Sequence, residues 1–351
     1  MTELYFTEQV ADVLLSLLGE GRKAFVLTDE NVWREVVCRN EELKSLVGQR
    51  MCLKVVPAGE ATKSIDTATE IWRWLTENSA TRSSLMVNIG GGMITDLGGF
   101  AAATFKRGMP FVNVPTSLLG AVDAALGGKT GVDFDGLKNQ VGVFRQPEAV
   151  VFSTGCFATL PAEQLRSGYA EMLKHALLEG GELLTDTLAA ADDVCTGGVS
   201  LDLLKRNIQV KQSVVNEDPE EGGLRRILNL GHTVGHALEE WRQAKGKPVP
   251  HGYAVAWGLT VELALAVLRH GLDSNVYRAV AKTVGRLYGS PCVTCNDYPA
   301  LHSLMRHDKK NRSADEITLA MLEAPGRCLP AVVHDTKDID AAFDLARDIL
   351  D

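Results

Sequence analysis

Short apolar runs alternate with amphipathic stretches in the first half of the chain. Four runs have the length and composition of buried strands: residues 24–28, 51–56, 84–89 and 111–114. Between the second and third runs, Ile65, Ala68, Ile71 and Leu75 recur at helical spacing, and Ser64 stands where a helix N-cap is expected. Strands that alternate with helices in this way predict a parallel, doubly wound sheet, which binds ligands at the carboxyl ends of its strands.

The second half of the chain has longer helical periodicities. They begin after Pro161 and cover residues 163–179, 201–215, 235–241 and 251–269. We therefore expect two domains with a boundary near Cys156: an α/β domain of residues 1–155 and a mainly α-helical domain of residues 156–351.

Composition and charge narrow the function classes. Hydrophobic residues make up 45% of the 351 residues and charged residues 23%, which excludes a disordered chain. The formal net charge of -9 argues against nucleic acid as a partner, because phosphate-backbone binding needs a basic face. No apolar run reaches the length needed to cross a bilayer, so no membrane association is expected.

The expected compartment is the cytoplasm. The start of the chain lacks the basic region and apolar core of an export signal. The seven cysteines are scattered and odd in number, which indicates reduced thiols. Cys292 and Cys295 have the spacing of a redox or zinc pair, but no second pair or flanking histidine completes such a site.

Three histidines stand among glycines and indicate a metal site. His232 and His236 are four residues apart, so on a helix they share one face, and His251 follows soon after. Neutral imidazole is a common ligand of zinc-like ions. Glu171 is the best candidate for a carboxylate ligand, since Lys174, one helical turn on, could orient it. The alternative is an ordinary surface or core histidine pair.

A glycine triplet follows the predicted strand at residues 84–89. Gly90 to Gly92 lead toward Asp96, and a strand that runs through glycines into a helix can cradle a pyrophosphate against backbone amides. A tight turn without a ligand explains the triplet equally well, because the full dinucleotide-binding fingerprint is absent. Thr116 and Ser117 follow the strand at 111–114, where their hydroxyls could meet a cofactor.

Basic residues in loop-like surroundings suggest a small anionic substrate. They are Lys106, Arg107, Lys129, Lys138, Lys211, Arg225, Arg226, Lys309 and Lys310. Any one of them could equally be a solvated surface residue.

Taken together, the motifs resemble the 3-dehydroquinate synthase family from about residue 59 to residue 311. The motifs are Gly90-Gly-Gly-Met-Ile-Thr-Asp96, Phe105-Lys-Arg-Gly108, Val114-Pro-Thr-Ser-Leu-Leu119, residues 123–129, Lys138-Asn139, Gly168-Tyr-Ala-Glu171-Met-Leu-Lys174, residues 228–236, His251-Gly252 and residues 308–310. The resemblance implies an N-terminal Rossmann-like domain that binds NAD, a helical domain that binds a divalent metal, zinc or cobalt, and a homodimer.

The resemblance also implies a reaction. The family converts 3-deoxy-D-arabino-heptulosonate 7-phosphate, a sugar phosphate, into 3-dehydroquinate and phosphate in the shikimate pathway. The steps are a transient oxidation by NAD, β-elimination of phosphate, re-reduction and an intramolecular aldol closure. NAD is therefore regenerated in each turnover.

Residue roles follow by position from the resemblance alone. It makes Glu171, His232 and His251 the metal ligands and turns His236 toward the substrate, in contrast to the simple pair of His232 and His236. NAD contacts would be Glu60, Lys63, Gly92, Met93, Ile94, Thr95, Asp96, Thr116, Ser117, Asp123, Lys138 and Thr159. Substrate contacts would be Lys129, Asn139, Lys174, Lys211, Arg225, Asn229, His236, Lys309 and Lys310, with Arg107 donated by the neighbouring subunit.

The chain departs from the family pattern at a few positions. Ser117 stands in place of a threonine, Thr95 in place of a glycine, Tyr253 in place of a glutamate, and Ala124-Ala125 in place of two serines. The alternatives are another sugar phosphate cyclase, a metal-dependent polyol or glycerol phosphate dehydrogenase, and a noncatalytic NAD-binding protein.

Overall fold

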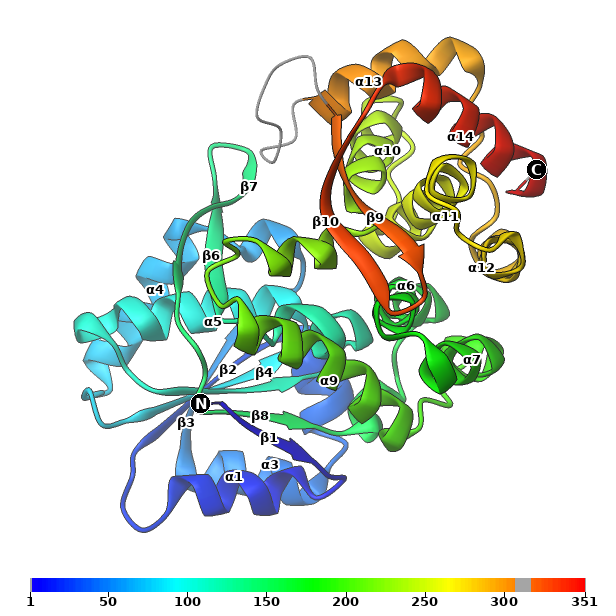
Figure 1. Ribbon diagram of the computed structural model, residues 1–351. Coiled ribbons are helices and arrows are strands. Elements are labelled where there is room, and N and C mark those ends of the chain that lie inside the picture. Colours follow the sequence, from blue (N-terminus) through cyan, green and yellow to red (C-terminus); the bar gives the residue numbers. More distant parts are fainter. Residues whose placement is uncertain (1, 307–316, 351) are drawn as a thin grey trace. The chain divides into compact units, whose positions relative to one another are not determined.

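The computed structural model describes residues 2–306 and 317–350 (Figure 1). The chain divides into two compact units: Met1–Pro161 with Val199–Leu201, and Ala162–Gly198 with Asp202–Asp351. The division after Pro161 coincides with the start of the first long helix, whereas the position near Cys156 lies within a short helix at Thr154–Phe157. Lys309 and Lys310 lie outside the described residues.

The first unit is built on a six-stranded sheet in the order β1-β8-β5-β4-β2-β3. The strands are β1 (Glu3–Phe6), β2 (Ala24–Asp29), β3 (Met51–Val56), β4 (Leu85–Gly90), β5 (Phe111–Pro115) and β8 (Ala149–Phe152). Every neighbouring pair is parallel. The prediction of a parallel, doubly wound sheet is therefore confirmed.

Helices cover both faces of this sheet. They are α1 (Val10–Leu18), α2 (Glu30–Val32), α3 (Glu41–Arg50), α4 (Ile65–Glu77) and α5 (Gly92–Thr104). Figure 1 shows α1 and α3 on one face and α4 and α5 on the other, as right-handed crossovers require when the strand order reverses. Ser64 caps α4, since its hydroxyl accepts a hydrogen bond from the Thr67 amide at 3.2 Å.

A two-stranded hairpin, β6 (Lys129–Phe134) and β7 (Leu137–Phe144), completes the first unit. Its turn passes through Asp135 and Gly136, both with positive φ. Lys129, which the sequence placed in a loop, begins β6 and pairs with Phe144. The hairpin was not predicted, although Asp135-Gly136 is a common hairpin turn and Leu137, Val141 and Val143 share one face of the largely exposed strand β7.

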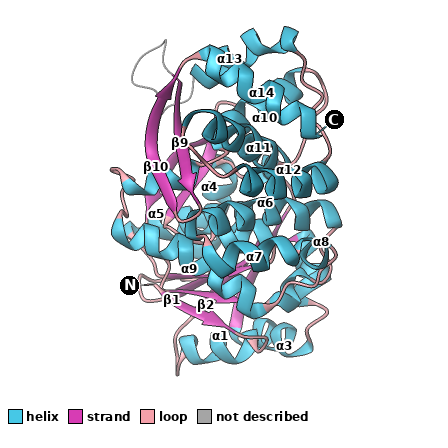
Figure 2. Cartoon of the chain, turned by 45° about the vertical axis from the view of Figure 1, so that its right-hand side comes forward, coloured by secondary structure: helices cyan, strands magenta, loops and turns pink. Residues whose placement is uncertain are grey.

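The second unit is mainly helical. Its helices are α6 (Ala162–Glu179), α7 (Gly181–Ala189), α8 (Ala191–Cys195), α9 (Leu201–Glu217), α10 (His232–Ala244), α11 (His251–Arg269), α12 (Ser274–Tyr288), α13 (Tyr298–Arg306) and α14 (Thr336–Leu350). An antiparallel ribbon of β9 (Ile317–Ala324) and β10 (Arg327–His334) accompanies them (Figure 2). The ribbon was not expected.

Helix α11 corrects the expectation that no apolar run is long enough to cross a bilayer. By length and composition it could cross a membrane, yet 78% of its most apolar window is buried. Its apolar character has a structural cause: α11 is packed against α6, α10, α12 and α14, so almost every face of it meets protein.

Candidate metal centre and nucleotide loop

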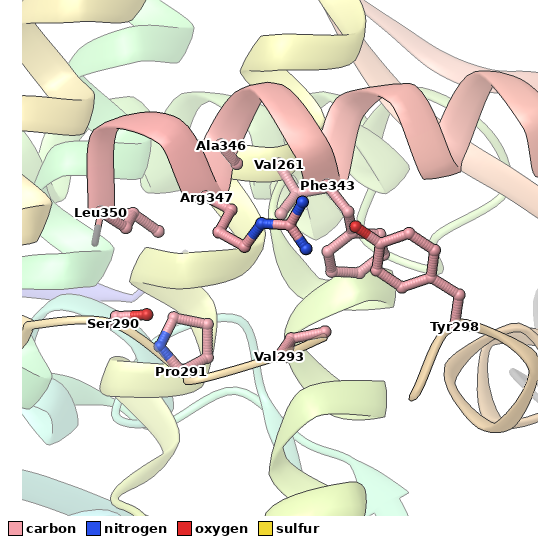
Figure 3. A pocket seen from close by; sticks show the side chains of 9 residues that line it. All are labelled: Val261, Ser290, Pro291, Val293, Tyr298, Phe343, Ala346, Arg347 and Leu350. Atoms are coloured by element: carbon pink, nitrogen blue, oxygen red, sulfur yellow. The ribbon is translucent and has the colours of Figure 1, made fainter. Parts of the chain in front are cut away.

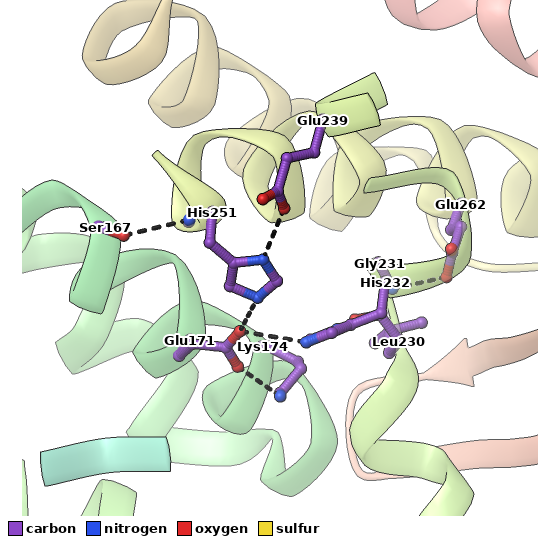
Figure 4. A network of polar contacts seen from close by, with 10 residues as sticks. Ser167, Glu171, Lys174, Leu230, Gly231, His232, Glu239, His251 and Glu262 are labelled. Carbon is purple, nitrogen blue, oxygen red and sulfur yellow. Dashed lines mark hydrogen bonds and ion pairs between the residues drawn. The ribbon is translucent and has the colours of Figure 1, made fainter. Parts of the chain in front are cut away.

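Three potential ligands from three helices meet in the second unit (Figure 4). Glu171 lies on α6, His232 is the first residue of α10, and His251 is the first residue of α11. One ligand atom from each lies within 4.8 Å of the other two. Glu171 is fully buried, while the His251 side chain is 31% exposed. One carboxylate and two imidazoles at this spacing could hold a divalent metal.

Close helix packing brings these residues together. A Cβ atom on Gly258 of α11 would lie 2.0 Å from the carbonyl oxygen of Gly231, which precedes His232. A Cβ atom on Gly252 would lie 2.1 Å from the carbonyl oxygen of Ser167 on α6. Only glycine permits these approaches, so the glycines beside the histidines bring α6, α10 and α11 into backbone contact.

The charge states of the cluster suit a cation. Burial opposes ionisation of Glu171, but the Lys174 ammonium group and the two histidines outweigh it and hold the pKa of this carboxyl well below its usual range. Burial lowers the pKa of His232 in spite of the nearby carboxylate. A deprotonated carboxylate and a neutral imidazole are the forms that ligate metal.

The orientations of the His232 and His251 rings also suit a bound cation. The Nδ1 atom of His232 lies 3.2 Å from the Leu230 carbonyl oxygen, and its Nε2 atom lies 3.3 Å from Oε1 of Glu171. The Nε2 atom of His251 lies 3.8 Å from the same oxygen. Oε2 of Glu171 is paired with the Lys174 ammonium group, so Oε1 is the oxygen directed toward both imidazoles. A carboxylate oxygen that faces two ring nitrogens in this way could share a bound cation with them.

His236 lies beside this group rather than within it. Its ring centroid is 5.4 Å from that of His232 and 5.5 Å from that of His251, and the residue is exposed. The first interpretation from spacing, a metal pair of His232 and His236, is corrected: the ligand atoms that cluster belong to His232 and His251. Helical spacing could not reveal this, because His251 reaches the group from a different helix.

Several expected substrate residues of the second unit are buried although they are basic. Lys174, Lys211 and Arg225 are 1%, 6% and 3% exposed. Arg225 is fixed by its loop: its amide donates to Asp218 at 2.9 Å and its guanidinium donates to the Pro219 carbonyl oxygen at 2.8 Å. Buried cations are costly unless compensated, and the Glu171 carboxylate compensates Lys174 while the Pro219 carbonyl oxygen accepts from Arg225.

In the first unit, the glycine triplet joins β4 to α5. Gly91 is the N-cap of α5, and the Thr116 amide donates to the Gly90 carbonyl oxygen at 2.9 Å, which ties the ends of β4 and β5 together. The amides of Gly92, Met93 and Ile94 fall in the first turn, where no intrahelical acceptor exists. These amides could bind a phosphate group.

The side chains of this loop are less available. Ile94 packs in the hydrophobic core, and Thr95 is 1% exposed with its hydroxyl donating to the Gly92 carbonyl oxygen at 3.0 Å. Ala124 lies against the loop, since a Cβ atom on Gly92 would come within 3.1 Å of its Cβ atom. The alanine that departs from the family pattern is therefore a direct neighbour of the loop backbone.

Lys63 is the centre of a polar group near this loop. Its ammonium group lies 2.7 Å from Oδ2 of Asp96 and 2.6 Å from Oδ1 of Asn139, and 3.8 Å from Oε1 of Glu60. Burial raises the pKa of Asp96 to about 6 even though Lys63 favours its charged form. The structure thus unites three expected NAD contacts with Asn139, an expected substrate contact.

The remaining expected residues lie at several places in the two units. Asp123 is in a short π-helix at Gly120–Ala124, and Ser117 accepts a hydrogen bond from the Gly120 amide at 3.1 Å. Lys138 is exposed on β7, and Thr159 is exposed after the helix Thr154–Phe157. Asn229 contacts Glu221 at 3.4 Å.

Arg107 is exposed in the turn Phe105–Arg107, where Lys106 and Arg107 both have positive φ. A left-handed backbone at two successive residues other than glycine is uncommon and costs free energy.

Two carboxylates of the cluster were missed by sequence reasoning. Oε2 of Glu239 lies 2.9 Å from Nδ1 of His251, and Oε2 of Glu262 accepts from the Gly231 amide at 2.6 Å. A signal existed for Glu239 alone, since it follows His232 and His236 at the spacing of one helix face.

A separate small pocket in the second unit offers little chemistry (Figure 3). Its lining is Val261, Ser290, Pro291, Val293, Tyr298, Phe343, Ala346, Arg347 and Leu350. Arg347 is paired with Asp344 at 2.9 Å. Cys292 and Cys295 flank Val293 as exposed, unbridged thiols and join no group of three metal-ligating side chains in the described part of the chain.

These features define a class of two-unit enzymes in which an α/β unit of the nucleotide-binding type accompanies a helical unit with a metal-type centre. Two family models match the chain: the 3-dehydroquinate synthase N-terminal model at residues 53–167 and the C-terminal model at residues 168–311. The chain belongs to the 3-dehydroquinate synthase family.

Individual relatives agree with this assignment. A 3-dehydroquinate synthase of Parabacteroides distasonis is 40% identical over 86% of this chain and 85% of its own length. A 2-epi-5-epi-valiolone synthase from Streptomyces hygroscopicus, solved with NAD+ and Zn2+, has a TM-score of 0.83 and 26% identity over 99% of this chain and 97% of that one. A 2-deoxy-scyllo-inosose synthase with carbaglucose-6-phosphate, NAD+ and Co2+ has a TM-score of 0.81 at 23% identity over 99% and 96%, which shows the fold alone.

Proposed function

We propose that the chain is a 3-dehydroquinate synthase, which converts 3-deoxy-D-arabino-heptulosonate 7-phosphate into 3-dehydroquinate and phosphate. The observation that carries the proposal is the buried group of Glu171, His232 and His251 in a chain that both family models match. The enzyme is a carbon–oxygen lyase of aromatic amino acid biosynthesis that uses NAD and a divalent metal, zinc or cobalt.

Glu171, His232 and His251 would hold the metal. When bound, the metal supplies Lewis acidity toward a substrate hydroxyl, and NAD supplies an acceptor that takes up a hydride and returns it. Lys174 keeps Glu171 deprotonated, which preserves the charge of the ligand set. Support for both cofactors comes from the solved valiolone synthase with NAD+ and Zn2+.

The NAD contacts proposed are those implied by family position. The first turn of α5 offers backbone amides to the pyrophosphate, and Lys63 with Asp96 and Glu60 forms a polar group beside it. Because Ile94 and Thr95 are buried, their contribution is through the backbone. The other proposed contacts are Thr116, Ser117, Asp123, Lys138 and Thr159.

Cationic and polar side chains would bind the substrate phosphate and carboxylate. They are Lys129, Asn139, Lys174, Lys211, Arg225, Asn229, His236, Lys309 and Lys310. Fixed positive charge stabilises the phosphate as it departs, and the anchoring of Arg225 by its own loop means that little reorganisation is needed at that moment. The protein is further proposed to be a cytoplasmic homodimer in which Arg107 acts on the partner's substrate.

The test is phosphate release from the heptulosonate phosphate with NAD and zinc or cobalt added. Phosphate should appear in many-fold excess over NAD without a steady rise of NADH absorbance, because the hydride returns to the substrate. Stoichiometric accumulation of NADH would establish a dehydrogenase instead. A set of other sugar phosphates, assayed in parallel, separates this activity from that of a related cyclase: faster release from one of them would overturn the proposed substrate.

A further inference from the structure

His251 is the most exposed of the three candidate metal ligands, Glu171, His232 and His251. Its side chain is 31% exposed, compared with 11% for His232 and 0% for Glu171. It also lies farther from Oε1 of Glu171 than His232 does, 3.8 Å against 3.3 Å. An exposed ring at a helix start has more rotational freedom than a buried one, so something must fix its orientation if it is to serve as a ligand.

The two imidazoles are held by different acceptors (Figure 4). Nδ1 of His232 faces the carbonyl oxygen of Leu230, a neutral acceptor two residues away. Nδ1 of His251 faces a carboxylate from another helix, Oε2 of Glu239 on α10, at 2.9 Å. Glu239 is itself largely buried, with 18% of its side chain exposed, so its charge is poorly screened by water.

The chemistry of this contact determines the tautomer of His251. A carboxylate only accepts hydrogen bonds, so Nδ1 must carry the proton and the lone pair is left on Nε2, the atom that faces Glu171. A negative acceptor on Nδ1–H also makes Nε2 a better electron donor. Both effects favour binding of a cation at Nε2.

We infer that Glu239 is a positioning residue that fixes the ring and the tautomer of His251 for metal binding. The inference rests on the proposed function, because it requires a metal at Glu171, His232 and His251. The competing role for Glu239 is a purely structural tie between α10 and α11. That tie is already supplied by the backbone approach at Gly258 and by the contact of Glu262 with the Gly231 amide.

The experiment measures Co2+ affinity on the full chain without NAD or substrate, by competition with a chromophoric chelator after removal of metal. Glu239→Ala should bind Co2+ about 10- to 100-fold more weakly than the native chain, the range typical of such outer ligand partners. Glu239→Gln, which can still accept a hydrogen bond but lacks the charge, should lie between them. The matched control is Glu240→Ala, since Glu240 is the exposed neighbour on the same helix, and its affinity should be native.

Two further readouts separate positioning from structure. The visible absorption band of bound Co2+ should change in Glu239→Ala, because the ligand field of a reoriented His251 differs, and the Tm of the metal-free variant should stay near the native value. Native Co2+ affinity and spectrum in Glu239→Ala would overturn the inference. So would a large loss of Tm with unchanged affinity. If the native chain itself does not bind Co2+ or Zn2+, the proposed metal centre fails and the inference falls with it.

Discussion

His236 and His251 are both within 5.5 Å of another ring of the cluster, yet their surroundings differ. His251 directs Nε2 toward Glu171, and its other nitrogen is held by Glu239. His236 is exposed on α10 and belongs to no group of three ligands in the described part of the chain. We therefore expect His236 to contact the substrate, as its position in the family implies, rather than the metal.

This difference predicts opposite outcomes for two alanine variants. His251→Ala should lose most of its bound metal, because one of three protein ligands is gone. His236→Ala should keep its metal and lose substrate binding or turnover. Elemental analysis after gel filtration gives the metal content, and circular dichroism confirms that each variant is folded. Equal metal loss in both variants would restore the simpler pair of His232 and His236.

At the residue scale, the sequence was informative where chemistry is carried by residue type. Glu171, the histidines and Lys174 could be identified as candidates from residue type and helical spacing, and the resemblance to the family supplied the expected ligand set. The role of Glu262 could not be identified in this way. It depends on the crossing of α10 and α11, which places a side chain of one helix against the backbone of the other.

At the scale of secondary-structure elements, the crossing of α10 and α11 brings the candidate metal ligands His232 and His251 together. Gly258→Ala would place a Cβ atom 2.0 Å from the Gly231 carbonyl oxygen, a backbone atom that cannot move aside alone. The helices must separate, so we expect a loss of about 1–3 kcal/mol or more in the free energy of unfolding and weaker metal binding. Urea denaturation and the chelator titration measure both.

The matched control for Gly258→Ala is Gly48→Ala. Gly48 lies within α3, its φ is not positive, and a Cβ atom there would meet no atom within 4 Å. This substitution should be neutral or should stabilise the protein by about 0.5–1 kcal/mol, since alanine favours helix over glycine. A loss as large as that of Gly258→Ala would refute the argument from helix crossing.

A second contact between elements predicts a pH dependence of stability. His334 ends β10, and its ring is 5.2 Å from that of His270, which follows α11. Burial, and then the charge of His270, lower the pKa of His334 to about 4 from 6.5, although Asp335 and Asp338 favour its charged form. Between these values the unfolded chain binds a proton that the folded chain does not, so stability falls as pH falls from 6.5 to 4.

The contribution of one such group cannot exceed about 1.4 kcal/mol per pH unit. His334→Gln should therefore flatten the decline of the unfolding free energy over this window without abolishing it. The measurement is urea denaturation of the native chain and the variant at several pH values from 7 to 4.5. Identical slopes for both proteins would show that His334 does not contribute.

Helices and strands could be predicted from the sequence where burial leaves a recognisable pattern of apolar residues. β2, β4 and β5 are buried throughout and largely apolar because both faces of the sheet are covered, and they were found. The edge strand β3 is only partly buried, but its apolar residues were sufficient to identify it. β1 and β8 were not, since each has four residues and β1 pairs with a segment far along the chain. The hairpin of β6 and β7 was missed although Asp135-Gly136 could have indicated its turn, because Asn139 interrupts the apolar positions of the exposed strand β7.

For the whole molecule, the sequence was sufficient to identify the protein family but not to predict how copies of the chain associate. The order of motifs along the chain identifies the family, and the match of both family models over residues 53–311 agrees with it. The proposed association of two copies is different, because it would depend on surfaces that no local pattern encodes. The proposed action of Arg107 on a partner's substrate is therefore the prediction that most needs an experiment.

Arg107 lies in a strained, exposed turn before β5, and its guanidinium group has the planar fork that suits phosphate oxygens. If it acts across a symmetric dimer, each site needs both chains. Homodimers of Arg107→Ala and of His251→Ala should both be nearly inactive. In a mixed dimer, the Arg107→Ala chain keeps its metal ligands and receives a native Arg107 from its partner, so one of the two sites is intact.

Random re-pairing of equal amounts of the two variants should therefore restore roughly a quarter of wild-type sites, because about half of the dimers are mixed and each has one intact site. Differently tagged chains and mass measurement establish that subunits have exchanged. A mixture with demonstrated exchange but only the activity of the parent homodimers would place Arg107 in the active site of its own chain or outside any active site.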